Sequence, residues 1–128
     1  MLAPVPDILA KCFKNKSILE EARKDPLAYK KKPRLQSAVA MMRATDYIAL
    51  HMEDLKHPVL ILHGEADEVT CPEISKELYN RCSSTDKTLK IYPTCWHNLL
   101  VGEPEEISKG IFNDVVEWLQ NQNSKRKK

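Results

Sequence analysis

Residues 57–67 read HPVLILHGEAD, and here the pattern of the chain changes from helical to extended. The continuous apolar run Val59–Leu62 is typical of a strand that is buried on both faces of a parallel sheet. A glycine and acidic residues follow this run. Asp67 is therefore expected in the loop that leaves the carboxyl end of the strand.

The next segments predict a helix and a second strand. Thr70 and Glu73 have the spacing of a helix capping box, and the polar residues 83–86 supply a turn that ends the helix. The inner face of this helix is expected to contain Ile74, Leu78 and Cys82. Residues 87–92 alternate polar and apolar side chains, which indicates a strand. Two strands joined by a helix form a parallel βαβ unit.

A last helix is predicted after the loop 93–102. Pro104 suits the first turn, and the negative charges of Glu103, Glu105 and Glu106 favour the positive end of the helix dipole. The buried face is expected to consist of residues at a spacing of four, widened by further apolar residues: Ile107, Ile111, Val115, Leu119, Phe112, Val116 and Trp118.

Residues 1–56 have a helical pattern that prolines interrupt, so two or three short helices are expected. The predicted breaks are Pro4, Pro6, Pro26 and Pro33. An apolar stripe that needs a covering surface is formed by Leu35, Ala38, Val39 and Met42, and less regularly by Tyr47, Ile48, Leu50 and Leu55. Met41 and Met42 are interpreted as core or groove-lining residues.

The composition fits one modest domain of 128 residues, 42% of them hydrophobic. The net charge of +2 gives no strong reason to expect nucleic acid or an acidic membrane as the main partner. The basic runs Lys30–Arg34 and Lys125–Lys128 could be a nuclear address or a phosphate patch, and we interpret them as a solvated loop and a frayed end. Residues 123–128 are expected to form a disordered basic tail.

The four cysteines show no C-x-x-C pair and are too few for a disulfide scaffold, so free thiols are expected. No apolar run approaches the roughly 18 residues of a membrane span, and the N-terminus lacks the pattern of a secretory signal. A cytoplasmic location is therefore expected.

The candidate chemistry lies in the loops after the two predicted strands. Functional crevices of open parallel sheets lie outside the carboxyl ends of their strands, where Asp67 and His97 are expected to meet. An aspartate so placed can fix the tautomer of a histidine that acts as a general base. The alternative from the residues alone is that both are solvated loop residues.

Other polar residues carry weaker signals. The pair Glu65 and Glu68 is expected to diverge along an extended loop, and Cys95 is interpreted as a packing residue. We predict no metal ion and no cofactor, because no cysteine stands at zinc-ligand spacing beside the three histidines that recur every six residues: His51, His57 and His63.

Three segments carry a resemblance to a known family: PVLILHGEADEVT at 58–70, SSTDKTLKIYP at 83–93 and WHNLLVGEP at 96–104. They resemble the C-terminal part of the monoacylglycerol lipase family, especially its plant branch of caffeoylshikimate esterase-like proteins. The resemblance runs from about Pro58 to Leu119. A weaker one, KPRLQSAV at 32–39, extends upstream.

The resemblance implies an α/β fold, namely the C-terminal βαβα part of an α/β-hydrolase (residues 57–122) preceded by helical cap segments (residues 1–56). It implies a serine hydrolase that cleaves monoacylglycerol or another small carboxylic ester, with a mobile cap that could contact membranes peripherally. Asp67 matches the family's triad acid and His97 its base. Leu99 and Leu100 would face the acyl channel.

The sequence departs from the family because it contains no Gly-x-Ser-x-Gly nucleophile motif; its three glycines are Gly64, Gly102 and Gly110. We therefore expect a partial enzyme that is inactive alone and marginally stable, because a strand at 59–62 with one unpaired side exposes polar backbone. One alternative is a non-catalytic module that pairs with another chain through this edge. Another is an independent hydrolase whose dyad activates water or uses Cys95 or Ser83 as nucleophile.

Overall fold

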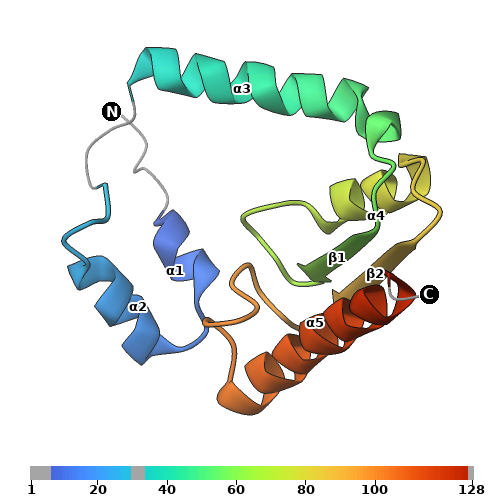
Figure 1. The fold of residues 1–128 in the computed structure, drawn as a ribbon. Coiled ribbons are helices and arrows are strands. Elements are labelled where there is room, and N and C mark those ends of the chain that lie inside the picture. The colour runs from blue at the N-terminus through green and yellow to red at the C-terminus, as the bar shows by residue number, and fades with distance from the viewer. Residues whose placement is uncertain (1–6, 30–33, 127–128) are drawn as a thin grey trace.

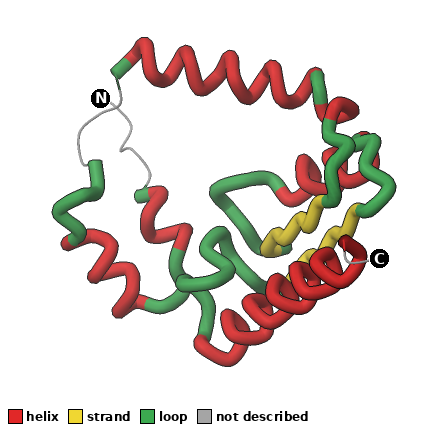
Figure 2. Tube along the Cα trace, viewed as in Figure 1, coloured by secondary structure: helices red, strands yellow, loops and turns green. Residues whose placement is uncertain are grey.

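The computed structural model describes residues 7–29 and 34–126 (Figure 1). The chain has an α/β fold in which helices flank two short strands (Figure 2). In chain order the elements are α1 (Ile8–Cys12), α2 (Lys16–Lys24), α3 (Leu35–Leu50), the 3₁₀ helix η1 (Met52–Asp54), β1 (Val59–Gly64), α4 (Pro72–Arg81), β2 (Lys87–Tyr92) and α5 (Glu105–Arg126).

Strands β1 and β2 are parallel, and their register runs from Val59 opposite Lys87 to Gly64 opposite Tyr92. Helix α4 connects them and packs against both, while α5 runs along the other side of the pair (Figure 1). The predicted βαβα order is confirmed. The bounds of β2 are as predicted, and β1 extends past the apolar run to Gly64.

The core of the described residues is small. Its most buried apolar side chains are Leu19, Met52, Ile61, Cys82, Cys95 and Ile111. Packing onto α4 already begins in η1, because Met52 is buried and Glu53 forms an ion pair with Arg81 at 2.9 Å. All four cysteines are free, as expected.

The predicted inner faces of the helices are only partly right. On α5, Ile111 is 1% exposed, but Leu119 is 54% exposed, and Ile107 and Phe112 also lie at the surface. On α4, Ile74 is exposed, whereas Cys82, which caps the end of this helix, is buried. The reason is the width of the sheet: two strands cover a narrow strip of each helix. Helix α5 also continues to Arg126, so residues 123–126 are helical rather than irregular.

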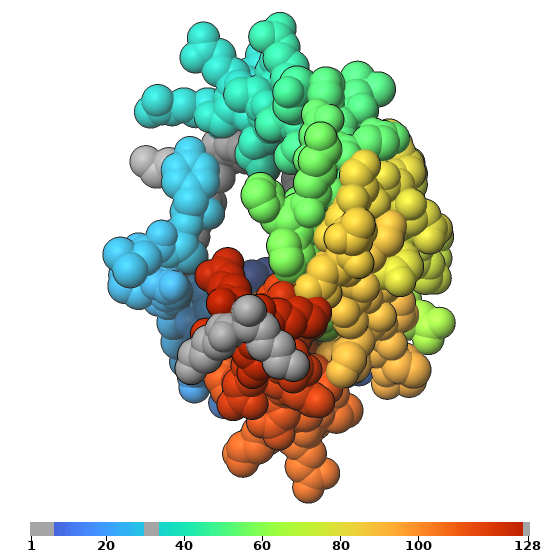
Figure 3. Space-filling view, turned by 45° about the vertical axis from the view of Figure 1, so that its right-hand side comes forward, coloured from blue at the N-terminus to red at the C-terminus, as the bar shows by residue number. Residues whose placement is uncertain are grey.

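Helix α3 contains no buried residue. The exposed apolar side chains on it are Leu35, Val39, Met41, Met42, Tyr47, Ile48 and Leu50. The interpretation of Met41 and Met42 as core or groove residues is therefore wrong for this chain, because no other described element covers the helix. Figure 3 shows α3 at one end of the molecule, away from α5. The run Lys30–Pro33 lies outside the described residues.

No described helix combines the length and the apolar composition that crossing a membrane requires.

One side of β1 has no strand partner within the described ranges, because the sheet there consists of β1 and β2 alone. The backbone N–H groups of Val59 and Glu65 donate to β2 residues or their neighbours, to Asp86 O at 3.0 Å and Tyr92 O at 2.9 Å. Backbone direction alternates along a strand, so the N–H groups of Leu60 and Leu62 point to the free side. Among the described residues, the unpaired edge expected from the sequence is therefore present.

Candidate active site

The two loops that leave the carboxyl ends of β1 and β2 are joined to each other. The N–H of Ala66 donates to Cys95 O at 3.0 Å, which extends the strand pairing into the loops. Gly64 allows this approach: a Cβ atom there would lie 2.5 Å from Trp96 O and closer still to Cys95 O. These backbone contacts place the loop of Asp67 beside the loop of His97.

Asp67 and His97 lie within hydrogen-bond distance of each other. The Nδ1 atom of His97 is 2.9 Å from Oδ2 of Asp67, and the side chains are 36% and 2% exposed respectively. The N–H at Nδ1 donates to the carboxylate, which leaves Nε2 as the acceptor nitrogen. No described residue forms a hydrogen bond with Nε2, so this nitrogen is free to take a proton from a reacting group.

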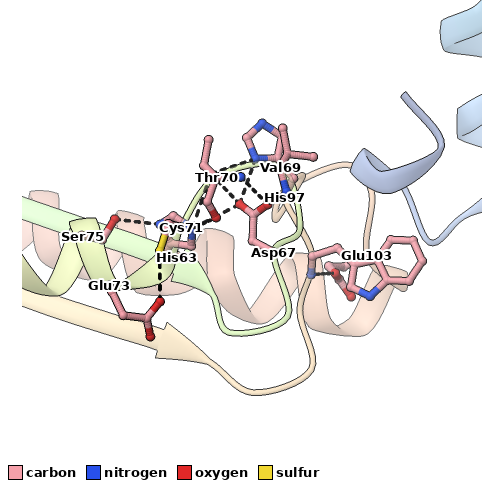
Figure 4. A network of polar contacts seen from close by, with 10 residues as sticks. His63, Asp67, Val69, Thr70, Cys71, Glu73, Ser75, His97 and Glu103 are labelled. Atoms are coloured by element: carbon pink, nitrogen blue, oxygen red, sulfur yellow. Dashed lines mark hydrogen bonds and ion pairs between the residues drawn. The ribbon is translucent and has the colours of Figure 1, made fainter. Parts of the chain in front are cut away.

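The carboxylate of Asp67 is at the centre of a polar network (Figure 4). Thr70 donates its hydroxyl to Oδ2 at 2.7 Å, and the N–H groups of Val69 and Thr70 donate to Oδ1 at 2.7 and 3.0 Å. Burial opposes ionisation, but the hydrogen bonds from Thr70, His97 and Val69 outweigh it and lower the pKa of Asp67 well below its ordinary value. The group is therefore a carboxylate at neutral pH.

A second histidine reaches the same carboxylate. Nε2 of His63 lies 3.1 Å from Oδ2 of Asp67 and 3.2 Å from Thr70 O, and Nδ1 lies 2.7 Å from Oγ of Ser75 (Figure 4). The two closest neighbours of Nε2, Asp67 Oδ2 and Thr70 O, are acceptors, so the proton is on Nε2 and the Ser75 hydroxyl donates to Nδ1. Sequence reasoning treated His63 only as a metal candidate. Its place at the carboxyl end of β1, just before Asp67, is the signal that was missed.

A small open pocket of about 130 Å³ adjoins the two triad candidates. Its lining consists of Leu62, His63, Gly64, Asp67, Thr70, His97 and Leu99. Leu99, one of the two predicted substrate contacts, is thus part of the site, whereas Leu100 is 49% exposed and does not line it. No cluster of three or more metal-ligating side chains occurs in the described part of the chain.

The family described as Hydrolase_4, serine aminopeptidase S33, matches residues 4–105. The chain belongs to this family. Among its relatives, caffeoylshikimate esterase of Arabidopsis thaliana is 39% identical over 91% of the chain, and human monoglyceride lipase is 26% identical over 83%. The chain spans only about a third of the length of each, 36% and 35%.

A solved structure agrees with the family. The crystal structure of Paleococcus ferrophilus monoacylglycerol lipase matches 87% of this chain and 42% of its own, with a TM-score of 0.78 and 25% identity. The resemblance to the monoacylglycerol lipase family is therefore confirmed. This S33 family member has the corresponding part of an α/β-hydrolase fold.

The predicted capping box of α4 is wrong. Helix α4 begins at Pro72, its N-cap Cys71 makes no side-chain cap hydrogen bond, and Glu73 instead contacts Lys76 and Cys71. The Thr70 hydroxyl instead donates to the buried carboxylate of Asp67 at 2.7 Å, a charge-assisted hydrogen bond that is stronger than one accepted from a helix N–H. Thr70 therefore belongs to the candidate active site rather than to the cap of α4.

Glu103 was also misread, as a charge at the start of α5. The helix begins at Glu105, and the Glu103 side chain is fully buried, 2.8 Å from Nζ of Lys14. One carboxylate oxygen accepts the N–H of Trp96 at 2.5 Å. Glu103 therefore holds the backbone next to His97, a contact that no local sequence pattern indicates.

The two alternative nucleophiles occupy unsuitable places. Burial and the nearby charge of Glu103 raise the pKa of the Cys95 thiol, and the residue is 2% exposed. Ser83 is exposed between α4 and β2, at the amino end of β2, whereas the dyad is at the carboxyl end. Of the flanking carboxylates, Glu68 forms an ion pair with Lys11 at 2.9 Å.

Proposed function

We propose that this chain supplies the acid, Asp67, and the base, His97, of a serine hydrolase that cleaves a small carboxylic ester. The observation that carries this proposal is the contact of 2.9 Å between His97 Nδ1 and a buried carboxylate, with Nε2 left to face a reactant. Family membership supports it. The relatives are a caffeoylshikimate esterase and monoglyceride lipases, so monoacylglycerol and other small carboxylic esters are the proposed substrates.

In this mechanism His97 moves one proton in each half of the reaction. Nε2 accepts the proton of a serine hydroxyl as its oxygen attacks the ester carbonyl, and Asp67 stabilises the imidazolium that forms. The imidazolium then gives the proton to the departing alcohol. Water deacylates the enzyme by the same route, which restores the serine. Leu99 would contact the apolar part of the ester beside the dyad.

We also propose that the nucleophile is not among these residues and that the chain alone is inactive. The 128 residues contain no Gly-x-Ser-x-Gly motif. A serine at a tight strand-to-helix turn and an oxyanion hole are both needed for acyl transfer. Neither Ser83 nor Cys95 is placed to replace that serine.

The first experiment measures hydrolysis of a short p-nitrophenyl ester and of a monoacylglycerol by the purified chain, together with labelling by a fluorophosphonate probe. We expect no turnover and no label. Turnover that His97→Ala abolishes would contradict the inactivity, because it would require a nucleophile within this chain.

A second experiment tests the dyad itself. In a chimaera this chain replaces the matching segment of Arabidopsis caffeoylshikimate esterase, so that the relative supplies the remaining active-site groups. We expect the chimaera to hydrolyse the ester. Asp67→Asn should lower the rate by about 10⁴-fold, and His97→Ala should abolish hydrolysis. His57→Gln is the matched control, since His57 precedes β1 at the opposite end of the strand. A folded but inactive chimaera would overturn the assignment of the dyad.

A second candidate function is a non-catalytic module that pairs with a full-length relative. The unpaired side of β1 favours it, because free N–H and C=O groups on an apolar strand form a template for another strand. Amide hydrogen exchange tests the idea. The amides of Leu60 and Leu62 should become protected when the relative is added, while those of Val59 and Glu65 should be protected in either state. Rapid exchange at Leu60 and Leu62 in the presence of the relative would exclude this edge.

We further propose a cytoplasmic protein that contacts membranes peripherally through α3, whose apolar side chains are exposed. Fluorescence microscopy of a tagged chain and sedimentation with phospholipid vesicles test the two parts. Replacing Met42 and Ile48 by lysine should abolish sedimentation with uncharged vesicles. Unchanged sedimentation of this variant would exclude α3 as the contact.

A further inference from the structure

The N-terminal segment Cys12–Asn15 forms backbone hydrogen bonds with the loop that carries His97. The N–H groups of Lys14 and Asn15 donate to Gly102 O at 3.0 and 3.1 Å, and Cys12 O accepts the N–H of Asn98 at 3.2 Å. Gly102 permits this approach, because a Cβ atom there would lie 2.9 Å from Cys12 O. The segment between α1 and α2 is therefore held against the second half of the loop that carries His97, at Asn98 and Gly102.

Side chains strengthen the same junction. Nζ of Lys14 lies 2.8 Å from Oε2 of Glu103 and also donates to Thr94 O, and it lies 5.7 Å from the centre of the Trp96 ring. The Lys14 side chain is 25% exposed and that of Glu103 is 0% exposed. Burial strengthens such a pair because water screens it little.

The anchors fall on both sides of His97. The preceding amide, that of Trp96, donates to Glu103, and the following amide, that of Asn98, donates to Cys12 O. The Lys14–Glu103 ion pair thus holds one flanking amide of the base, and the segment that carries Lys14 holds the other through its backbone. Of the two acceptors, Cys12 O belongs to the N-terminal segment, and the Glu103 carboxylate is paired with Lys14 of the same segment.

We propose that Lys14 and Glu103 are positioning residues, and that their buried ion pair makes the orientation of His97 toward Asp67 depend on how α1 and α2 are seated. This inference rests on the proposed role of His97 as base. It assigns to the junction between the N-terminal helices and the β2 loop a coupling function: displacement of Lys14 releases Glu103, then the Trp96 amide, and then the imidazole.

The test is the tautomer of His97, read from long-range ¹H–¹⁵N spectra of the ¹⁵N-histidine-labelled chain. The variants are Lys14→Met, Glu103→Gln and their combination, with Lys14→Arg to restore the charge. We expect the Nδ1–H of His97 to exchange on the order of tenfold faster in each single variant, as loss of one net hydrogen bond implies. The double variant should show no further change. Lys14→Arg keeps the positive charge and should therefore retain the native spectrum.

Lys11→Ala is the matched control, because Lys11 on α1 forms an exposed ion pair with Glu68 whose loss should leave His97 unchanged. Signals of His57 and the β1 and β2 amides report folding. An unchanged His97 in Lys14→Met, or loss of the strand signals together with His97, would overturn the positioning role. If the unaltered chain already lacks the Nδ1–H tautomer, the proposed function fails instead, so the two failures are distinguishable.

Discussion

Nε2 of His63 and Oδ2 of Asp67 lie 3.1 Å apart, at the same oxygen that Nδ1 of His97 approaches to 2.9 Å. Burial separates the two histidines: the His63 side chain is 12% exposed and that of His97 is 36% exposed. Ser75 and Thr70 fix both nitrogens of His63, whereas one nitrogen of His97 has no described partner. One histidine therefore supports the acid, and the other is available to a reactant.

Thr70→Val should raise the pKa of Asp67 toward its ordinary value, because it removes one donor from Oδ2 and keeps the shape of the side chain. Loss of a hydrogen bond to a charged group should lower the free energy of unfolding by about 1.5–3 kcal/mol. A ¹³C titration of the Asp67 carboxyl and urea unfolding measure the two effects. Thr85→Val, at an exposed turn position, is the control. An unmoved carboxyl titration would show that the hydroxyl is dispensable.

The stability of the chain should depend on pH through Asp67. Its pKa is lowered on folding, so its contribution to stability is present above the pKa of the unfolded chain, about 3.9, and is lost as pH falls toward the folded pKa. The difference in unfolding free energy between the native chain and Asp67→Asn should therefore be largest near neutral pH and shrink below about pH 4. Urea unfolding at several pH values measures it. A difference that stays constant on acidification would contradict the prediction.

Gly64→Ala and Gly110→Ala should have opposite effects on stability. At Gly64 the new methyl group meets the backbone carbonyls of Cys95 and Trp96, and such overpacking costs about 1–3 kcal/mol. At Gly110, within α5, nothing lies within 4 Å of the added Cβ. Alanine there should stabilise the chain by about 0.5–1 kcal/mol, because glycine is a poor helix residue. Equal effects of the two substitutions in chemical denaturation would refute this account of the strand-to-loop contact.

Ile111→Ala and Leu119→Ala separate the covered part of α5 from the uncovered part. Ile111 is 1% exposed, so truncation should cost about 2–5 kcal/mol through lost burial and a cavity. Leu119 is 54% exposed, and its truncation should change stability by less than about 0.5 kcal/mol. Thermal unfolding of both variants provides the measurement. A large loss at Leu119 would mean that this face of the helix is covered in solution.

Local sequence patterns predicted most of the secondary structure and the proximity of Asp67 and His97. The apolar run before His63 and the alternation after Asp86 predicted parallel strands. The rule that parallel strands present their carboxyl ends at one edge then placed Asp67 beside His97. Thr70 and Glu103 were misread because each has a plausible local role, and only the tertiary contacts show which acceptor or donor it meets. Helical periodicity likewise identified the apolar side of α3 but not whether the same chain covers it.

The register of β1 against β2 has a consequence for the chemistry. Gly64 lies opposite Tyr92, and the two loops depart from this last matched pair. A slip of one residue moves one strand by about 3.3 Å along the other. Hydrogen-bond distances span only roughly 2.7–3.2 Å, so such a shift would break the contact between acid and base. Only one register of the two strands brings Asp67 and His97 together, and the neighbouring registers do not. An intact dyad is therefore a sign that β1 and β2 are paired correctly.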